Sequence, residues 1–336
     1  MLSRRTALLA LLAMVPGPAL LACSSKGGGG AGAGGKPTLA VIPKGTTHEF
    51  WKSVHAGAVK AGKELDVEIL WKGPLKEDDL KSQIDIVESM KAQGVAGIVL
   101  APLNDKGLVN AVKGAVDGKI PVVIFDSDLQ GKAHASFVAT DNVAAGRLAG
   151  EHLAKALGGK GKVVLLRYQE GSASTQNREQ GFVEAIKKAE GVSLVSDNQY
   201  GGATTESAFT ASENILAAQK AADGGVDGVF CPNESTTFGM LRALQNQKLA
   251  GKIKLVGFDA SEKLVKGLDD GVIDALVVQN PFRMGELAVQ TMVSVIRGTK
   301  VEPRIDTGAQ LVTKANMTDP AVKELLHPDL KKWLGE

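Results

Sequence analysis

From Thr38 onward, short runs rich in Val, Ile and Leu alternate with longer segments in which apolar residues recur every three or four positions. A short continuous apolar run indicates a strand buried on both faces, and the longer recurrence indicates an amphipathic helix. The predicted strands of the first half cover residues 39–42, 67–71, 96–101, 121–126 and 136–139, with helices between them such as 79–93 and 105–117. This alternation predicts a parallel sheet covered by helices on both faces.

The same order of elements begins again after residue 160. The second set of predicted strands covers residues 162–167, 193–196, 228–231, 254–258 and 275–279, and the helices between them cover 174–189, 205–222 and 236–248. A repeated order of this kind favours two similar open lobes over one very large sheet or a closed barrel. The expected fold class is therefore α/β, with two Rossmann-like, doubly wound parallel-sheet lobes.

The N-terminal segment is polar at its start and apolar afterwards. Arg4 and Arg5 precede an apolar run at residues 7–15, and small residues precede Cys23. This pattern is typical of an export signal and is too short for a membrane-spanning helix. The residues before Cys23 resemble a bacterial lipobox, which predicts a signal peptide at residues 1–22 and a lipid on Cys23. The two arginines leave both the general and the twin-arginine export routes open.

Residues 23–37 are rich in Gly and precede every predicted element. A Gly-rich loop binds phosphate only when it lies between a strand and a helix N-terminus, so this segment is interpreted as a flexible tether. Cys231 is the only other cysteine. If Cys23 carries lipid, no intramolecular disulfide is possible, and Cys231 is expected to be a small buried hydrophobic residue.

Composition narrows the class of partner. Hydrophobic residues make up 44% of the 336 residues, charged residues 23%, and the formal net charge is +2. These values argue against disorder and against nucleic acid as the partner. They are compatible with a small diffusible ligand and two domains of ordinary size.

Polar residues follow several of the predicted strands. In open α/β sheets, ligands bind beyond the carboxyl ends of the strands, so these residues are expected to face a cleft between the lobes. They are Lys44, Asp126, Asp128, Asn233, Asp259 and Gln279.

This set of side chains suits a neutral, polyhydroxylated ligand. Carboxylates, amides and Arg178 match hydroxyl groups, each of which donates one hydrogen bond and accepts two. The adjacent aromatic residues Phe50 and Trp51 suit the apolar C–H faces of a sugar ring.

Catalysis has little support. The five histidines, at positions 48, 55, 134, 152 and 327, do not form an H-x-x-x-H or H-E-x-x-H pattern, and no G-x-S-x-G motif occurs. Asp126 and Asp128 are too close in sequence to face each other as a hydrolytic acid pair. We therefore expect no enzyme activity, no metal and no cofactor.

Structural interpretations compete with the functional ones. Asp259 is a candidate N-cap for a helix at residues 261–268, and Asp141 for a helix at 142–157, where we favour the cap. Phe50 and Trp51 could simply pack between the first helix and the sheet. Arg178 could be a solvated helix charge, and Lys44 could hold a turn.

The residues from about 38 to 319 resemble the periplasmic sugar-binding proteins of ABC transporters, of the ribose, galactose and xylose type. The motifs that carry the resemblance are H-E-F-W ending at Trp51, V-I-F-D ending at Asp126, R-x-x-G-F beginning at Arg178 and preceded by Ser172 or Ala173 where the family has Ser, F-C-P-N ending at Asn233, V-G-F-D ending at Asp259, and V-V-Q ending at Gln279. The resemblance implies that these segments bind the ligand, with His48 as the polar residue of the first.

Two departures bear on the ligand. This chain has Ser127 and Ala101 where ribose-type proteins have Arg and Asn. Segments around Lys44, Asp126 and Gln176 instead resemble the branch that binds rhamnose or autoinducer-2. The resemblance therefore implies a monosaccharide or related polyol and does not identify one sugar.

The resemblance also implies the organisation of the chain. Three hinge segments near residues 139–141, 279–281 and 308–310 would join an N-terminal lobe (38–139 plus 280–307) to a C-terminal lobe (140–279 plus 308–336). Such proteins are monomers in the periplasm, or at the outer face of the cytoplasmic membrane, and deliver the ligand to a membrane permease. A ligand-sensing receptor coupled to a sensor kinase or chemoreceptor is the alternative. A repressor is disfavoured, because a signal and a tether occupy the place of a DNA-binding domain.

Overall fold

The computed structural model describes residues 35–335. The predicted signal peptide, Cys23 and most of the predicted tether lie outside these residues. The described residues from Lys36 onward form one compact unit. None of the described helices is both long and apolar enough to cross a membrane.

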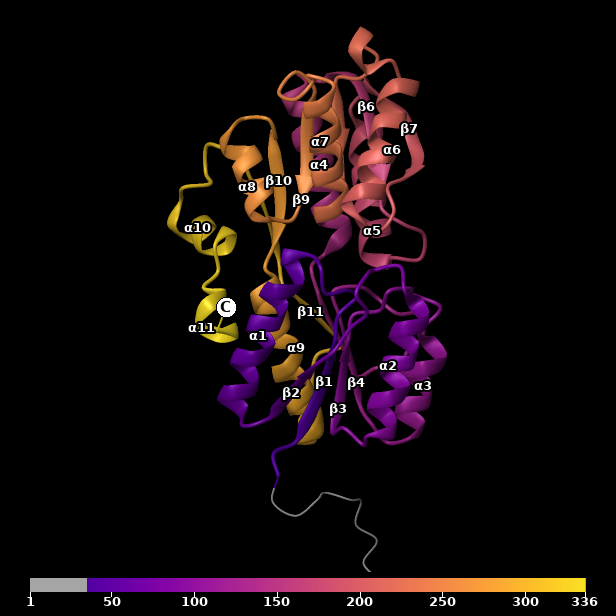
Figure 1. Cartoon of the computed structure of the whole chain (residues 1–336), viewed down its shortest axis with the longest axis vertical. Helices are drawn as coiled ribbons and strands as arrows, with labels where there is room; N and C mark the ends of the chain where they lie inside the picture. Colours follow the sequence, from indigo (N-terminus) through magenta and orange to yellow (C-terminus); the bar gives the residue numbers. More distant parts are fainter. Residues whose placement is uncertain (1–34, 336) are drawn as a thin grey trace, which may run out of the picture. The chain divides into compact units, whose positions relative to one another are not determined.

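The first sheet has six parallel strands in the order β11-β5-β4-β3-β1-β2. They are β1 (Thr38–Ile42), β2 (Glu68–Trp71), β3 (Gly97–Leu100), β4 (Val122–Phe125), β5 (Ser136–Ala139) and β11 (Arg304–Asp306). Helices α1 (Glu49–Leu65) and α9 (Pro281–Ile296) cover one face, and α2 (Leu80–Ala92) and α3 (Val109–Asp117) cover the other (Figure 1). This arrangement agrees with the predicted alternation of strands and helices.

The second sheet has the order β12-β10-β9-β8-β6-β7 and is parallel except for β12, which runs antiparallel to β10. Its strands are β6 (Lys160–Arg167), β7 (Gly191–Tyr200), β8 (Gly228–Phe230), β9 (Lys254–Phe258), β10 (Ala275–Gln279) and β12 (Ala309–Val312). Helices α4 (Asn142–Ala156) and α5 (Ala173–Lys188) pack on one face, and α6 (Thr205–Ala218), α7 (Glu234–Asn246) and α8 (Glu262–Asp269) on the other. The predicted class of two doubly wound α/β lobes is confirmed.

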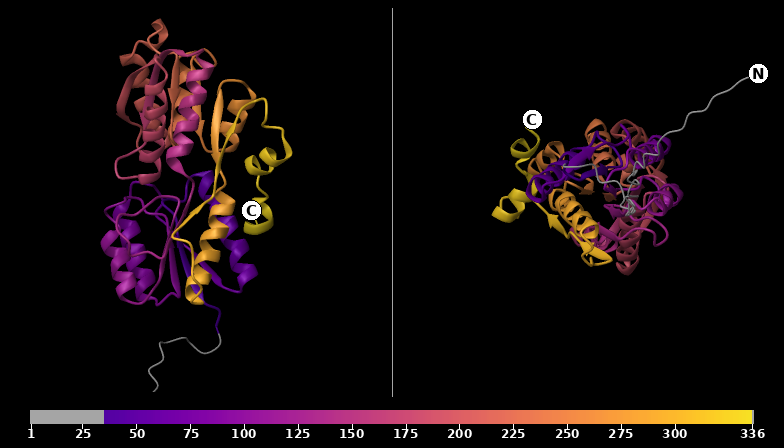
Figure 2. Two further views of the ribbon diagram at one scale, coloured as in Figure 1. Left: turned by 180° about the vertical axis from the view of Figure 1, so that it is seen from behind. Right: turned by 90° about the horizontal axis from the view of Figure 1, so that it is seen from below.

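The last part of the chain was not predicted from the sequence. Helix α10 (Pro320–Leu326) buries Val322 and Leu326 in the hydrophobic core of the second sheet. Helix α11 (Leu330–Leu334) contacts α1, which covers the first sheet. Figure 2 shows this C-terminal segment in yellow beside both sheets. Its helices are short, so their apolar residues show little periodicity.

Several predicted boundaries differ from the observed ones for local reasons. The helix expected at 205–222 ends at Ala218, because Lys220 adopts a left-handed backbone with φ 51° and a 3-10 turn follows at Ala221–Asp223. The helix expected at 105–117 begins later, at Val109. The cap predicted for Asp141 is confirmed, since its carboxylate accepts a hydrogen bond from the Ala144 N–H.

In each lobe, two helices pack closely where glycines of each helix face the backbone of the other. A Cβ atom on Gly146 of α4 would lie 1.9 Å from the Arg178 carbonyl oxygen, and one on Gly181 of α5 would lie 2.0 Å from that of Val143. The pair α1 and α9 repeats this arrangement through Gly57 and Gly285. No side chain fits at these distances, so glycine allows the helix backbones to approach closely. Arg178 and the N-terminal turn of α1 take their positions from these contacts.

The substitution Gly146→Ala is expected to destabilise the fold by more than about 2 kcal/mol, because the methyl group would overlap a backbone carbonyl that cannot move alone. The matched control is Gly114→Ala in α3, where the nearest atom to the new Cβ would be the flexible Lys91 Nζ at 3.4 Å. The control is expected to be neutral or slightly stabilising. Urea denaturation measures both variants, and equal midpoints for the two would contradict the packing argument.

Candidate functional site

A cavity lies where residues that follow strands of both sheets meet. About 310 Å³ of space free of protein atoms lies among its lining residues, including the opening to solvent. Its lining residues are Lys44, His48, Phe50, Trp51, Glu77, Asp126, Tyr168, Ser174, Thr175, Arg178, Asn233, Asp259 and Gln279. All residues expected at a ligand site therefore line it, except Asp128 and Gln176.

Asp128 and Gln176, the other two residues expected at the ligand site, do not line this cavity. Asp128 is exposed, and its carboxylate accepts a hydrogen bond from the Leu129 N–H, which closes a local turn. Gln176 is half-buried on α5, while its neighbours Ser174, Thr175 and Arg178 line the cavity. Successive helix positions point in different directions, so only one face of α5 reaches the site.

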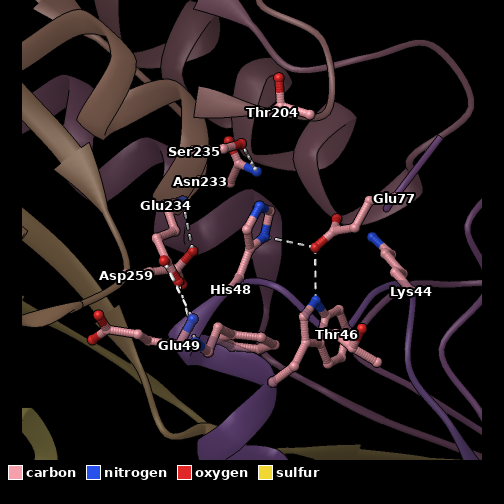
Figure 3. A network of polar contacts seen from close by, with 12 residues as sticks. Lys44, Thr46, His48, Glu49, Glu77, Thr204, Asn233, Glu234, Ser235 and Asp259 are labelled. Atoms are coloured by element: carbon pink, nitrogen blue, oxygen red, sulfur yellow. Dashed lines mark hydrogen bonds and ion pairs between the residues drawn. The ribbon is translucent and has the colours of Figure 1, made fainter. Parts of the chain in front are cut away.

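The buried carboxylate of Glu77 organises one side of the cavity (Figure 3). Trp51 Nε1 donates to Oε1 at 2.7 Å, and His48 Nδ1 lies 2.7 Å from the same oxygen. The Tyr168 hydroxyl, which follows β6, donates to Oε2 at 2.8 Å. Glu77 therefore joins the start of α1 to an element of the second sheet.

Glu77 and His48 carry opposite charges at neutral pH. Burial alone would lower the pKa of His48, but the attraction and hydrogen bond of Glu77, together with the charges of Glu234 and Asp259, outweigh burial and raise this pKa to about 9. Burial alone would raise the pKa of Glu77, but the attraction and hydrogen bond of His48, together with Lys44 and Trp51, outweigh burial and lower this pKa to about 2. The pair is thus an internal salt bridge over a wide pH range.

Lys44 and Asp126 form a second buried pair at the ends of β1 and β4. The Lys44 Nζ lies 3.3 Å from the Asp126 carboxylate and donates to the hydroxyls of Ser172 and Ser174 at 3.1 and 2.9 Å. Lys44 is only 2% exposed, so its role is not limited to holding a surface turn.

Arg178 is buried, so it is not a solvated helix charge. Its guanidinium stacks 3.9 Å from the centre of the Phe258 ring. Nε donates to Asn142 Oδ1 at 2.8 Å, and Nη1 donates to the Pro232 carbonyl at 2.9 Å. Nη2 has no hydrogen-bond partner although it is buried. The arginine is therefore fixed in position with one donor left open.

Gln279, at the end of β10, complements Arg178. Its Nε2 donates to Asp259 Oδ1 at 2.8 Å, while its Oε1 is buried without a partner. The cavity wall thus carries one unused donor and one unused acceptor. Buried polar atoms without partners are uncommon in folded proteins, and each is costly unless a bound molecule satisfies it.

Acidic side chains bind the N-termini of three helices around the cavity, and Figure 3 shows the contacts at the starts of α7 and α1. The Asp259 carboxylate accepts from the Glu234 N–H at 3.0 Å, which starts α7. The Glu234 carboxylate accepts from the N–H groups of Glu49 and Phe50 at 3.3 and 3.1 Å, at the start of α1. The Glu49 carboxylate accepts from the Glu262 N–H at 2.9 Å, at the start of α8. Asp259 is thus not the N-cap of α8, a position that Ser261 takes.

Asp126 and Asp259 share an unusual backbone. Their φ angles are 60° and 71°, in the left-handed region that residues with side chains seldom adopt. One residue ends β4 of the first sheet and the other ends β9 of the second. Such strain is tolerated where the surroundings hold it, and here both carboxylates line the same cavity.

The two adjacent aromatic residues have different environments. Trp51 is 3% exposed and packs edge-on to Phe125, in the core between α1 and the first sheet. Phe50 is half-buried, lines the cavity and meets the Trp51 ring in a T-shaped arrangement at 4.9 Å. One ring therefore anchors the helix, and the other is available at the cavity wall.

Sequence reasoning missed Glu77, Tyr168, Ser174 and Thr175 as lining residues. Tyr168 directly follows β6, so the strand-end rule applied to this strand would have identified it. Glu77 lies in the irregular segment between β2 and α2, where periodicity carries no signal. Asn233 was identified, yet its side chain also caps α7 by accepting from the Thr236 N–H.

The described residues contain no cluster of three or more His, Cys, Asp or Glu side chains that could hold a metal ion. The buried Cys231 matches the expectation of a small hydrophobic residue, and burial raises the pKa of its thiol far above the usual value.

Comparison with known proteins gives a consistent picture. A family model described as a periplasmic binding protein domain matches residues 39–300. The ribose import binding protein of Escherichia coli is 28% identical over 281 residues, with 83% of this chain and 91% of that protein covered. The D-ribose/D-allose-binding protein of Pseudomonas aeruginosa is 31% identical over 290 residues, with 83% and 89% covered.

Solved structures agree with this result. A carbohydrate transporter solute binding protein from Agrobacterium radiobacter, in complex with D-arabinose, superposes with a TM-score of 0.81 at 37% identity, covering 87% of this chain and 99% of that one. A solute binding protein from Agrobacterium vitis with bound D-fucose gives 0.82 at 36% identity, covering 86% and 100%.

The His48–Glu77 pair predicts how stability depends on pH. A raised histidine pKa contributes stability that is complete below its ordinary value of 6.5 and is lost as the pH rises through about 9. The lowered pKa of Glu77 contributes stability that is complete above 4.5 and is lost as the pH falls through about 2. The melting temperature should therefore fall between pH 6.5 and 9 in the wild type and much less in His48→Gln.

The matched control for this measurement is His134→Gln. Burial lowers the pKa of His134, so its titration lies below the range that is scanned. Its melting curve against pH should run parallel to that of the wild type above pH 6.5. Parallel curves for His48→Gln and the wild type would show that the pair does not contribute.

Proposed function

Because the chain belongs to the periplasmic binding protein domain family, we propose that it is an extracytoplasmic solute-binding protein that binds a monosaccharide or related polyol between its lobes. The observation that carries the proposal is the pair of open atoms, Arg178 Nη2 and Gln279 Oε1, in the wall of one buried cavity. A hydroxyl group both donates and accepts, so hydroxyls on adjacent carbons satisfy the two atoms together.

The charges in the cavity favour a neutral ligand. Lys44, His48 and Arg178 supply positive charge, and Glu77, Asp126 and Asp259 supply negative charge. Two of these pairs are in direct contact, Lys44 with Asp126 and His48 with Glu77. An ionic ligand would leave one of these buried charges without compensation, which is costly. A sugar gains charge-assisted hydrogen bonds and leaves the balance unchanged.

The ligands named for the similar proteins support the same class. Two relatives are named for ribose and for ribose or allose, and two similar structures hold D-arabinose and D-fucose. All four compounds are monosaccharides. The aromatic ring of Phe50 at the cavity wall suits the C–H face of such a ring.

The residues that we propose as the binding site are Lys44, His48, Phe50, Trp51, Asp126, Arg178, Asn233, Asp259 and Gln279, together with Glu77, Tyr168, Ser174 and Thr175. The proposed lobes are 38–139 plus 280–307 and 140–279 plus 308–336. With these bounds, the bonds of Lys44 to Ser174 and of Tyr168 to Glu77 join the two lobes. Hinge motion that breaks them would open the cavity to solvent.

A thermal-shift screen tests the proposal, because a ligand that binds only the folded protein raises its melting temperature. We expect a shift with one or more compounds among pentoses, hexoses, deoxysugars, polyols and autoinducer-2. Amino acids and short peptides serve as the comparison set. A shift with these and with no sugar or polyol would disprove the proposed ligand class.

Two isosteric variants test whether a sugar identified in the screen binds in this cavity. Asp126→Asn removes a buried charge at the cavity wall and should weaken binding of the identified sugar by more than about tenfold, about 1.4 kcal/mol. The matched control, Asp128→Asn, changes an exposed residue outside the cavity and should bind within a factor of about two of the wild type. Titration calorimetry measures the affinity of both variants for the sugar. Equal affinities would show that the sugar does not bind beside Asp126.

Cellular location and delivery are part of the same proposal. A lipid on Cys23, which lies outside the described residues, would hold the protein at the outer face of the membrane as a monomer that presents its ligand to an ABC permease. The substitution Cys23→Ala should move the protein from the membrane fraction to the soluble extracytoplasmic fraction and abolish incorporation of labelled fatty acid. The matched control is Cys231→Ala. Cys231 is fully buried, so this substitution should change neither the membrane fraction nor the incorporation of fatty acid.

A further inference from the structure

A second, larger cavity adjoins the first. It encloses about 800 Å³ of space free of protein atoms, including its open mouth. It is lined by Glu49, Phe50, Ser53, Asp259, Ala260, Glu262, Val278, Gln279, Pro281, Leu325, Leu326, His327, Pro328 and Leu330. Phe50, Asp259 and Gln279 line both cavities, so the two spaces share a wall. We call the second space the annex.

The C-terminal segment forms one side of the annex. Leu325 and Leu326 belong to α10, which is held in the core of the second sheet, and Leu330 begins α11, which contacts α1. Trp333 lies beside Lys63 of α1, with the ammonium 5.6 Å from the ring centre. The two short helices therefore span the annex between elements of both lobes.

The annex is lined by both apolar and polar groups. Phe50, Val278, Pro281 and the leucines of the C-terminal segment supply carbon surface. The Ser53 hydroxyl is buried without a hydrogen-bond partner, and so is Gln279 Oε1. Both residues are at least nine-tenths buried, with exposed fractions of 5% and 2%. These open atoms indicate that an occupant with polar and apolar parts fits the annex.

Charge excludes one class of occupant. Glu49, Asp259 and Glu262 line the annex, and no lysine or arginine does. An anionic group would be repelled by these carboxylates and would find no lysine or arginine to pair with. A neutral group that is mostly apolar is therefore favoured.

We propose that the cavity and the annex form one two-part ligand site. In this arrangement, which rests on the proposed function, the sugar ring lies in the first cavity and a neutral apolar substituent on the ring enters the annex past Phe50 and Gln279. The Ser53 hydroxyl donates to the oxygen that joins the ring to the substituent. The preferred ligand class is thus a glycoside with a small alkyl or aryl group.

Titration calorimetry on the purified protein tests this. The probes are D-ribose, D-allose, D-arabinose, D-fucose and any sugar identified by the screen, each as the free sugar and as its methyl and phenyl glycosides. For at least one sugar, a glycoside is expected to bind at least about tenfold more tightly than the free sugar, because its substituent leaves water for an apolar space.

Two variants fill the annex from opposite sides. Ser53→Leu adds bulk from α1, and Leu330→Trp adds bulk from the C-terminal segment, so one remains informative if the other fails to fold. Each should remove the advantage of the glycoside and leave affinity for the free sugar within about threefold of the wild type. Ser193→Leu on the exposed part of β7 is the matched control and should bind both compounds as the wild type does.

The outcomes separate this inference from the proposed function. Free sugars that bind while all their glycosides bind at least about tenfold more weakly would overturn the two-part site and leave the proposed function in place. A preference for the glycoside that survives in both filled variants would also overturn it. Binding of neither sugars nor glycosides would overturn both proposals.

Discussion

The carboxylate of Glu77 is the group on which the geometry of the site depends. It is 5% exposed, and a charge in that environment is stable only when several donors surround it. His48 and Trp51 come from the start of α1, and the Tyr168 hydroxyl comes from the end of β6. Their bonds to one carboxylate fix where α1 begins and how closely the two sheets' loops approach. The backbone at Gly45 packs directly against Glu77, because a Cβ on Gly45 would lie 2.8 Å from the Glu77 side chain.

The sequence predicted the features that depend on local pattern. Buried parallel strands read as continuous apolar runs, and the strand-end rule identified Lys44, Asp126, Asp259 and Gln279 because these residues follow such runs directly. Arg178 was recognised from its motif, although its burial against Phe258 depends on contacts that no periodicity shows.

The features that the sequence did not indicate depend on tertiary contacts. Glu77 lies in an irregular segment, and only the meeting of α1 with β6 gives it partners. Asp128 follows the same strand as Asp126, yet Asp126 has φ 60° and directs its carboxylate to Lys44, while Asp128 closes a turn. The edge strands β11 and β12 are short and partly exposed, so their composition does not distinguish them from loops.

Nearly all of the polar groups that line the cavity already have partners. Lys44 is bound to Asp126 and two serines, and Glu77 is bound to three donors. A ligand that adds charge would have to break one of these bonds. A ligand with hydroxyl groups needs only the two atoms that remain open, which belong to Arg178 on α5 and to Gln279 on β10. Strand β10 belongs to the second sheet, and α5 packs on that sheet. The first sheet then contributes the aromatic wall and the paired charges, so both lobes must be in place before the binding surface is complete.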